Sequence, residues 1–385
     1  MQTGAVVGGR FQIERLAGSG GMGVVYKAHD RVTGEPVAVK LLLATQSGDI
    51  TRFEREARVL IELSHPGIVR YVSHGVAPSG APYLAMEWLE GEDLLSRILR
   101  KPLSADEAIA LATRAAEALS AAHARDIVHR DLKPSNLFLV GGDIQRLKVL
   151  DFGIAKLVGM TRVTRTGMLV GTPGYMAPEQ ARSVQTIDAR ADVFSLGCVL
   201  YECLTGEPAF SGEHVMAVLG KVLFWDPPQL RDRGAEIPAS LDALVTRMLA
   251  KYPDDRLRDG AALLVALEGL RATGAENAPA NPRISRSFAL TGSERRTLSM
   301  VLMRHEQVVS AAEAETLGEE VVDAERELRR AAEKCGGHFD LLADGSVVVT
   351  FMSTRLATDQ AAVAARCALG LRAIAKSQPI VLATG

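Results

Sequence analysis

The repeat pattern of the chain changes near residue 91, and this change most limits the folds open to it. From residue 11 to 90, short stretches alternate apolar and polar side chains, as β-strands do, with one helical segment near residues 50–64. After that point, Ala- and Leu-rich segments at helical spacing follow one another up to residue 271. We therefore predict an α+β fold in which a β-rich lobe is followed by an α-rich lobe.

The first long helix of the α-rich lobe has a recognisable start. Ser104 precedes it and Glu107 stands three residues later, which is the spacing of a capping box. Further helices are predicted at residues 192–205, 212–223, 239–250 and 259–271.

A linker and a second unit are predicted after residue 271. Residues 272–293 are rich in Ala, Pro, Ser, Gly and Asn without an apolar repeat, which is typical of a linker. Residues 294–385 follow the order strand, helix, hairpin, helix, strand, with the hairpin turning at Asp344 and Gly345. This βαββαβ order predicts a small ferredoxin-like unit.

The composition agrees with two packed domains and argues against several functions. With 385 residues, of which 47% are hydrophobic, the chain can bury a sizeable core. A formal net charge of −2 gives no reason to expect nucleic acid or an anionic membrane as a partner. The four cysteines form no CxxC pair, and neither a signal peptide nor a membrane-spanning apolar run is visible. We therefore expect a cytoplasmic protein with reduced thiols.

The sequence GSGGMG places Gly18, Gly20 and Gly23 in a GxGxxG array between two predicted strands. Glycines let backbone amides approach phosphate oxygens closely. A plain glycine hairpin is the alternative interpretation. A dinucleotide-binding turn is disfavoured because a strand follows the array, and a Walker loop because no Gly-Lys-Ser/Thr follows.

Two charged residues stand where a nucleotide site would need them. Lys40, on the next strand in VAVK, is either a solvated lysine or a phosphate ligand held by a carboxylate, Glu56 or less favourably Glu54. Asp151 follows the strand LKVL in an Asp-Phe-Gly sequence. That arrangement suits a Mg²⁺-binding carboxylate beside a hinge, or an ordinary turn.

The stretch HRDLKPSN concentrates chemical groups on one predicted loop. Asp131 can orient a hydroxyl and accept its proton, Lys133 can neutralise a phosphoryl group, and Asn136 can offer an amide oxygen to a metal. Phosphoryl transfer needs such positioning and charge neutralisation more than covalent catalysis. We interpret His129 as a packing and hydrogen-bonding residue rather than a base.

Together, GSGGMGVV, VAVK, HRDLKPSN, DFG and GTPGYMAPE resemble, in this order, the motifs of eukaryotic-type Ser/Thr protein kinases of the bacterial kind. The resemblance covers about residues 11–271, and we assign residues 1–271 to this domain. It implies a bilobal kinase fold, ATP and Mg²⁺ as cofactors, and protein hydroxyls as substrates. The lysine of DLKPSN and the sequence GTPGYMAPE favour Ser/Thr over Tyr specificity.

The resemblance also assigns roles to single residues. It makes Asp131 the catalytic base with Lys133 beside the γ-phosphate, and Asn136 and Asp151 the Mg²⁺ ligands. Lys40 would contact the α- and β-phosphates and pair with Glu56, Met86 would be the gatekeeper, and the backbone from Glu87 to Leu89 would bind adenine. The implied ATP pocket comprises Gly18, Ser19, Gly20, Gly21, Gly23, Val25, Ala38, Lys40, Glu56, Met86, Glu87 and Leu89.

Two structural supports follow from the same resemblance. Asp192 would brace the catalytic loop, and Arg256 would be the partner of Glu179.

The segment after the DFG motif carries three threonines among basic residues: Thr161, Thr164 and Thr166. A phosphate on this segment could bind Arg130 and order the loop. We expect autophosphorylation there, with Thr164 and Thr166 as the leading candidates. Three ordinary surface threonines are the alternative, and Thr172 is expected to shape the substrate site.

Residues 294–385 resemble the front part of a class III nucleotide cyclase homology domain, through SERRTLSMVLM, GGHFDLLADGSVVVTF and ATDQAAVAARCALGLRA. That family carries a metal-binding aspartate after the first strand, where this chain has Arg304 and His305. Asp344 is a candidate for the second metal position. Since a two-metal site lacking a carboxylate should not work, we expect an incomplete, non-catalytic, regulatory or dimerising module. An ordinary α+β domain is the alternative.

Two other functions remain open at this point. A kinase-fold scaffold would need a broken catalytic motif, and none is visible. A bifunctional kinase–cyclase is disfavoured by Arg304 and His305.

Overall fold

The structure, a computed structural model, falls into two compact units, and the described residues up to 272 belong to the first and those from 298 to the second. The described residues are 1–20, 23–42, 49–152, 173–182, 184, 186–212, 214–233, 237–272, 298–303, 318–341, 346–352, 357–375 and 378–384.

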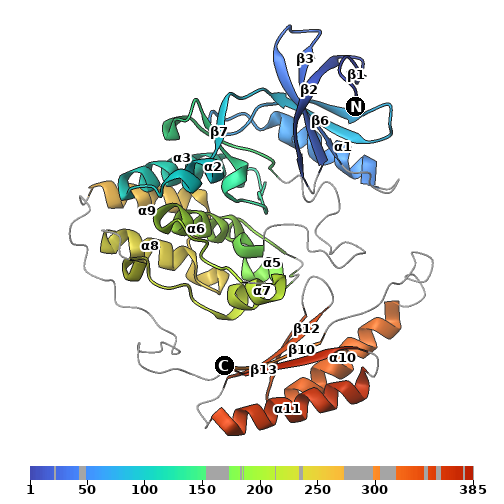
Figure 1. The fold of residues 1–385 in the computed structure, drawn as a ribbon, viewed down its shortest axis with the longest axis vertical. Helices are drawn as coiled ribbons and strands as arrows, with labels where there is room; N and C mark the ends of the chain where they lie inside the picture. The colour runs from blue at the N-terminus through green and yellow to red at the C-terminus, as the bar shows by residue number, and fades with distance from the viewer. Residues whose placement is uncertain are drawn as a thin grey trace. The chain divides into compact units, whose positions relative to one another are not determined.

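The first lobe is a curled antiparallel sheet with the strand order β1-β2-β3-β4-β6-β5. Helix α1 (Asp49–Glu62) buries Phe53, Ala57 and Leu60 and contacts β5 and β6 (Figure 1). The strands are β1 (Val6–Val7), β2 (Phe11–Gly20), β3 (Gly23–Asp30), β4 (Pro36–Leu42), β5 (Tyr71–Val76) and β6 (Pro82–Glu87).

Gly23 opens β3 with a φ of 150°, a conformation that only glycine adopts easily. A Cβ atom there would stand 2.0 Å from the carbonyl oxygen of Leu41. The glycine is therefore needed for the β2–β3 hairpin to lie against β4, which carries Lys40.

The second lobe is mostly helical. The capping box predicted at its first long helix is present, because Ser104 Oγ accepts from the Glu107 amide and the Glu107 side chain accepts from the Ser104 amide. A small antiparallel sheet, β7-β8-β9, lies beside the helices. The helices and strands of the second lobe are β7 (Gly91–Asp93), α2 (Leu94–Arg100), α3 (Ala105–His123), β8 (Leu137–Val140), β9 (Leu147–Val149), α5 (Pro178–Ala181), α6 (Arg190–Thr205), α7 (Val215–Phe224), α8 (Ala239–Met248) and α9 (Gly260–Ala272).

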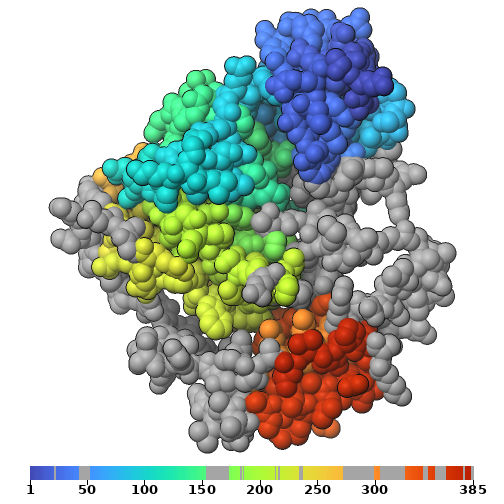
Figure 2. Space-filling view, viewed as in Figure 1, coloured from blue at the N-terminus to red at the C-terminus, as the bar shows by residue number. Residues whose placement is uncertain are grey.

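Helix α6 forms the centre of this lobe, since every residue from 191 to 204 is buried. Helices α3 and α8 both contact it. In Figure 2 the two lobes of the first unit stand out as separate masses, the first in blue and the second in cyan to yellow.

The second unit has the predicted order of elements: β10 (Leu298–Met303), α10 (Gly318–Lys334), β11 (His338–Leu341), β12 (Val347–Met352), α11 (Ala357–Ile374) and β13 (Ile380–Thr384). Its antiparallel sheet has the strand order β11-β12-β10-β13. Both helices lie on one face of the sheet (Figure 1), and Val301, Phe339 and Val349 form its core with Leu328 and Leu371 from the helices.

Several predicted features lie outside the described residues: the turn at Asp344 and Gly345, the linker from residue 273, and Arg304 and His305. All four cysteines are free thiols. Within the described ranges, no helix combines the length and the apolar character needed to cross a membrane.

Two glycines of α9 provide a matched test of the packing. A Cβ at Gly260 would stand 2.5 Å from the backbone nitrogen of Ser120 on α3, whereas a Cβ at Gly269 meets nothing within 4 Å. We predict that Gly260→Ala lowers the free energy of unfolding by about 1–3 kcal/mol through overpacking. Gly269→Ala should raise it by about 0.5–1 kcal/mol, because alanine is the better helix former.

Urea unfolding of both variants, followed by circular dichroism, makes the comparison. Equal effects at the two positions would show that α9 is not packed closely on α3.

Candidate active site

A cavity of about 500 Å³ lies beside the β2–β3 hairpin and continues to the segment after β6 and the end of β9. Eleven of the predicted residues line it: Gly18, Ser19, Gly20, Gly23, Val25, Ala38, Lys40, Met86, Glu87, Leu89 and Asp151. Gly21 lies outside the described residues. Trp88, inside the predicted stretch from Glu87 to Leu89, lines it as well. The sequence interpretation missed Ala17, Val69, Asp93, Ser135, Phe138 and Leu150, which also line the cavity.

Lys40 is 6% exposed and its Nζ donates to Asp151 Oδ2 at 2.6 Å. It stands on β4 between Val25 of β3 and Leu84 of β6, so the backbone that carries it is held by a strand on each side. Asp151 has a φ of 59°, the left-handed region, just after β9. The predicted partner Glu56 is half-buried on α1, and its pairing with Lys40 stays a prediction.

The loop before β8 gathers the polar groups of HRDLKPSN. Lys133 Nζ donates to Asp131 Oδ2 at 2.8 Å, and Asn136 Nδ2 donates to the Asp131 carbonyl at 2.8 Å and to Oδ2 at 3.3 Å. Pro134 begins a single 3₁₀ turn that brings Asn136 back towards Asp131. The amide nitrogen of Asn136 thus faces the loop, and its oxygen is the atom left for a cation.

Asp192, in the first turn of α6, holds the backbone of this loop. Its Oδ2 accepts from the His129 amide at 2.7 Å and its Oδ1 from the Arg130 amide at 2.8 Å. Oδ2 also contacts His123 Nε2 at 2.9 Å. The carboxylate is fully buried, which opposes its ionisation, but these donors outweigh burial and keep its pKa below the usual value.

His123 connects this carboxylate to α9. Its Nδ1 accepts from the Gly260 amide at 3.1 Å, so the ring proton must sit on Nε2 and point at Asp192. The sequence interpretation missed this residue. The only sequence feature that could have pointed to His123 is its position at the end of a predicted helix, six residues before His129.

His129 packs and bonds as predicted. It is fully buried, its Nε2 contacts the Leu150 carbonyl at 2.7 Å, and its ring lies 4.7 Å from that of Phe152. It therefore joins the loop that carries Asp131 to the residues on either side of Asp151.

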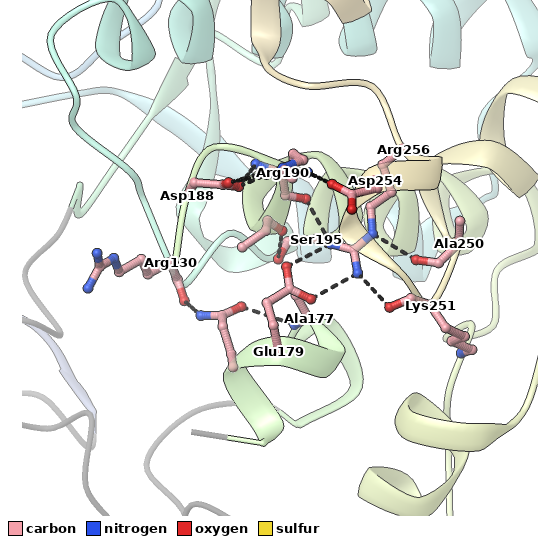
Figure 3. A network of polar contacts seen from close by, with 12 residues as sticks. Arg130, Ala177, Glu179, Asp188, Arg190, Ser195, Ala250, Lys251, Asp254 and Arg256 are labelled. Atoms are coloured by element: carbon pink, nitrogen blue, oxygen red, sulfur yellow. Dashed lines mark hydrogen bonds and ion pairs between the residues drawn. The ribbon is translucent and has the colours of Figure 1, made fainter. Parts of the chain in front are cut away.

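The expected pair of Arg256 and Glu179 is present and buried. Figure 3 shows Arg256 donating to both carboxylate oxygens of Glu179, at 2.7 and 2.9 Å, and to the carbonyls of Ala250, Lys251 and Arg190. The side chain of Arg256 is not exposed at all. This guanidinium ties α5, which begins within the GTPGYMAPE motif, to the start of α6.

The sequence pattern of the protein kinase domain matches residues 11–265. PknB of Mycolicibacterium smegmatis is 39% identical over 288 residues, 72% of this chain and 46% of that protein. Pkn1 of Myxococcus xanthus is 41% identical over 266 residues, 68% of this chain and 38% of that protein. Both relatives are named serine/threonine-protein kinases.

Solved structures agree with the fold. The Mycobacterium tuberculosis PknI kinase domain superposes with a TM-score of 0.57 at 26% identity, covering 70% of this chain and 98% of that one. Rad53 in complex with AMP-PNP gives a TM-score of 0.56 at 27% identity, covering 66% of this chain and 64% of that one.

The chain belongs to the protein kinase family, and its first unit is a bilobal Ser/Thr protein kinase domain of the bacterial type. The cofactors of such a domain are ATP and Mg²⁺, in agreement with the AMP-PNP complex. The chain spans less than half of the length of these two curated relatives.

Arg256 permits a stability test with a matched control. Arg256→Lys cannot reproduce the planar fork and leaves Glu179 poorly paired, so we predict a loss of about 3 kcal/mol in the free energy of unfolding. Arg190→Lys removes contacts to Asp188 and Asp254, whose side chains are 56% and 91% exposed. It should cost less than about 1 kcal/mol.

Chemical denaturation of the two Arg→Lys variants measures the difference. If Arg256→Lys loses no more free energy of unfolding than Arg190→Lys, the buried pair of Arg256 and Glu179 does not stabilise the fold as proposed.

Proposed function

We propose that the chain is an active kinase that transfers the γ-phosphate of ATP to Ser and Thr hydroxyls of proteins. The observation that carries this proposal is that two groups of polar side chains are joined by one backbone hydrogen bond. Lys133 and Asn136 both donate to Asp131, and Lys40 donates to Asp151 in the cavity. The amide of Leu150, next to Asp151, donates to the carbonyl of Asn136 at 2.8 Å. None of the catalytic positions expected from the family is replaced.

Asp131 is proposed to orient the substrate hydroxyl. Both side-chain donors, Lys133 and Asn136, bond to its Oδ2, so we assign Oδ1 to the hydroxyl. As the new O–P bond forms and the bond to ADP breaks, the hydroxyl proton passes to this carboxylate. Lys133, beside it, offsets the charge of the phosphoryl group in transit.

The donor set of the site fits Mg²⁺. Asn136 offers an amide oxygen and Asp151 a carboxylate, the hard oxygen ligands that this ion takes alongside phosphate oxygens and water. We propose these two residues as its protein ligands, and Lys40 as the contact for the α- and β-phosphates. Bound Mg²⁺ would neutralise charge on the phosphates.

The adenine is proposed to bind at the end of β6 and the segment after it. Met86 would be the gatekeeper, and the backbone from Glu87 to Leu89 would form the hydrogen bonds to the base. Support comes from the cavity, which these residues line together with Ala38 and Phe138.

Activation by autophosphorylation is proposed at Thr164 or Thr166, with Thr161 as the third candidate. All three lie outside the described residues, as does Thr172. Support comes from Arg130, which precedes Asp131 and extends away from the Glu179 pair in Figure 3. A phosphate near it would find a cation already fixed through its backbone to Asp192.

The second unit is proposed to be a ferredoxin-like module, spanning residues 294–385, that regulates or dimerises the kinase and does no chemistry of its own. Its element order and antiparallel strand order support this assignment. A relationship to class III cyclases rests on the sequence motifs alone. We also propose a cytoplasmic location, supported by the four free thiols.

Phosphotransfer from γ-labelled Mg-ATP tests the proposal. Asp131→Asn and Lys40→Met should each lower labelling of Ser and Thr at least about 10²-fold. The exposed residues Asp106 and Lys101 give matched controls, Asp106→Asn and Lys101→Met, which should label like the unaltered chain.

Labelling that persists in Asp131→Asn, or no labelling of a folded chain that binds ATP, would contradict the proposal. Mapping the labelled peptides locates the modified threonines, and an unmodified activation segment in an active enzyme would refute autophosphorylation there. The same assay on residues 1–271 shows whether the second unit changes the rate.

A further inference from the structure

The short segment between α1 and β5 is bonded on both sides. On one side, the Val149 amide on β9 donates to the Gly67 carbonyl at 2.8 Å, and the Val69 amide donates to the Val149 carbonyl at 3.0 Å. On the other, the Glu87 amide donates to the Arg70 carbonyl at 2.9 Å. The segment therefore joins the strand that leads to Asp151 to the end of β6.

A single carboxylate oxygen completes this connection. Glu87 Oε1 accepts from the Arg70 amide at 2.8 Å and from Lys148 Nζ, on β9, at 2.6 Å. Lys148 Nζ also lies 3.4 Å from the Ile68 carbonyl. Lys148 and Glu87 are thus bonded directly, and each is also bonded to the segment between them.

The ion pair is well shielded from water. The side chains of Lys148 and Glu87 are 20% and 21% exposed. An exposed ion pair of long side chains adds almost nothing to the stability of a fold. A pair that is buried to this extent and held by further hydrogen bonds is screened less by water and salt. Glu87 cannot turn away from Lys148 without also losing the Arg70 amide.

We infer that Lys148 is a positioning residue for nucleobase binding, acting through Glu87. This inference rests on the proposed function, in which the Glu87 backbone forms part of the edge that binds adenine. Glu87 lines the cavity, while its carboxylate is held by β9 and the preceding segment. Fixing that carboxylate fixes the peptide on which the base would bond, so binding loses less conformational entropy.

Because the interaction is made before and during the reaction alike, it should affect binding and not the chemical step. We predict that Lys148→Met raises the KM for ATP about fivefold, equivalent to about 1 kcal/mol, and leaves kcat within about twofold. Lys148→Arg, which keeps the charge, should recover most of the affinity. Lys101→Met is the matched control, since Lys101 is exposed.

Adenosine, used as a competitive inhibitor of the full chain, separates the base end of the site from the phosphate end. If Lys148 acts through Glu87, Lys148→Met should raise the inhibition constant of adenosine by the same factor as the KM for ATP. If the inhibition constant of adenosine is unchanged while the KM for Mg-ATP rises, the inference is overturned and the effect lies at Asp151. Unchanged values for both ligands would overturn it as well.

The two proposals fail in different ways. An unaltered chain that neither binds ATP nor transfers phosphate would refute the kinase activity. A normally active chain in which Lys148→Met behaves like Lys101→Met would refute only the role of Lys148.

Discussion

The buried carboxylate of Asp192 holds the backbone on which the proposed catalytic groups stand. Arg130 adopts a φ of 67°, a left-handed conformation that costs a non-glycine residue of the order of 1–3 kcal/mol. The strained peptide is kept in place because the amides of His129 and Arg130 both donate to Asp192. Asp131 is the next residue in the chain, so the hydrogen bonds from His129 and Arg130 to Asp192 set the orientation of its backbone. A charge buried this deeply is tolerated because its donors replace the water it has lost.

Helix α6 carries this anchor and a second one. Asp192 lies in its first turn, and the carbonyl of Arg190 at its start accepts from Arg256, which holds Glu179. The loop that carries Asp131 and the end of the GTPGYMAPE motif are therefore positioned by the same buried helix. A further buried hydrogen bond, between His129 and the carbonyl of Leu150, fixes the backbone next to Asp151. Local motifs supply the reactive groups, and buried hydrogen bonds between distant segments bring them together.

The parts of the molecule that were predictable from sequence are those with a local cause. The capping box at Ser104 and Glu107 involves only four consecutive residues, and the helix face of Phe53, Ala57 and Leu60 follows from its spacing. The polar contacts of Lys148 and His123 have no such signal, because each partner lies some 60 to 140 residues away along the chain. The three-residue strand β7 is too short to show a repeat. The roles of the site residues came from a family resemblance, which compensates for what periodicity cannot supply.

We propose that Asp192 positions Asp131 for phosphoryl transfer, and the kcat of the Asp192→Asn variant tests this role. Either orientation of the asparagine amide turns an NH₂ group towards at least one of the amides of His129 and Arg130, so the loop must shift. We predict that kcat falls about 10²-fold or more, the usual cost of a misplacement of about 1 Å, while the KM for ATP changes less than about threefold. A folded Asp192→Asn variant with nearly unaltered kcat would show that Asp192 does not position Asp131.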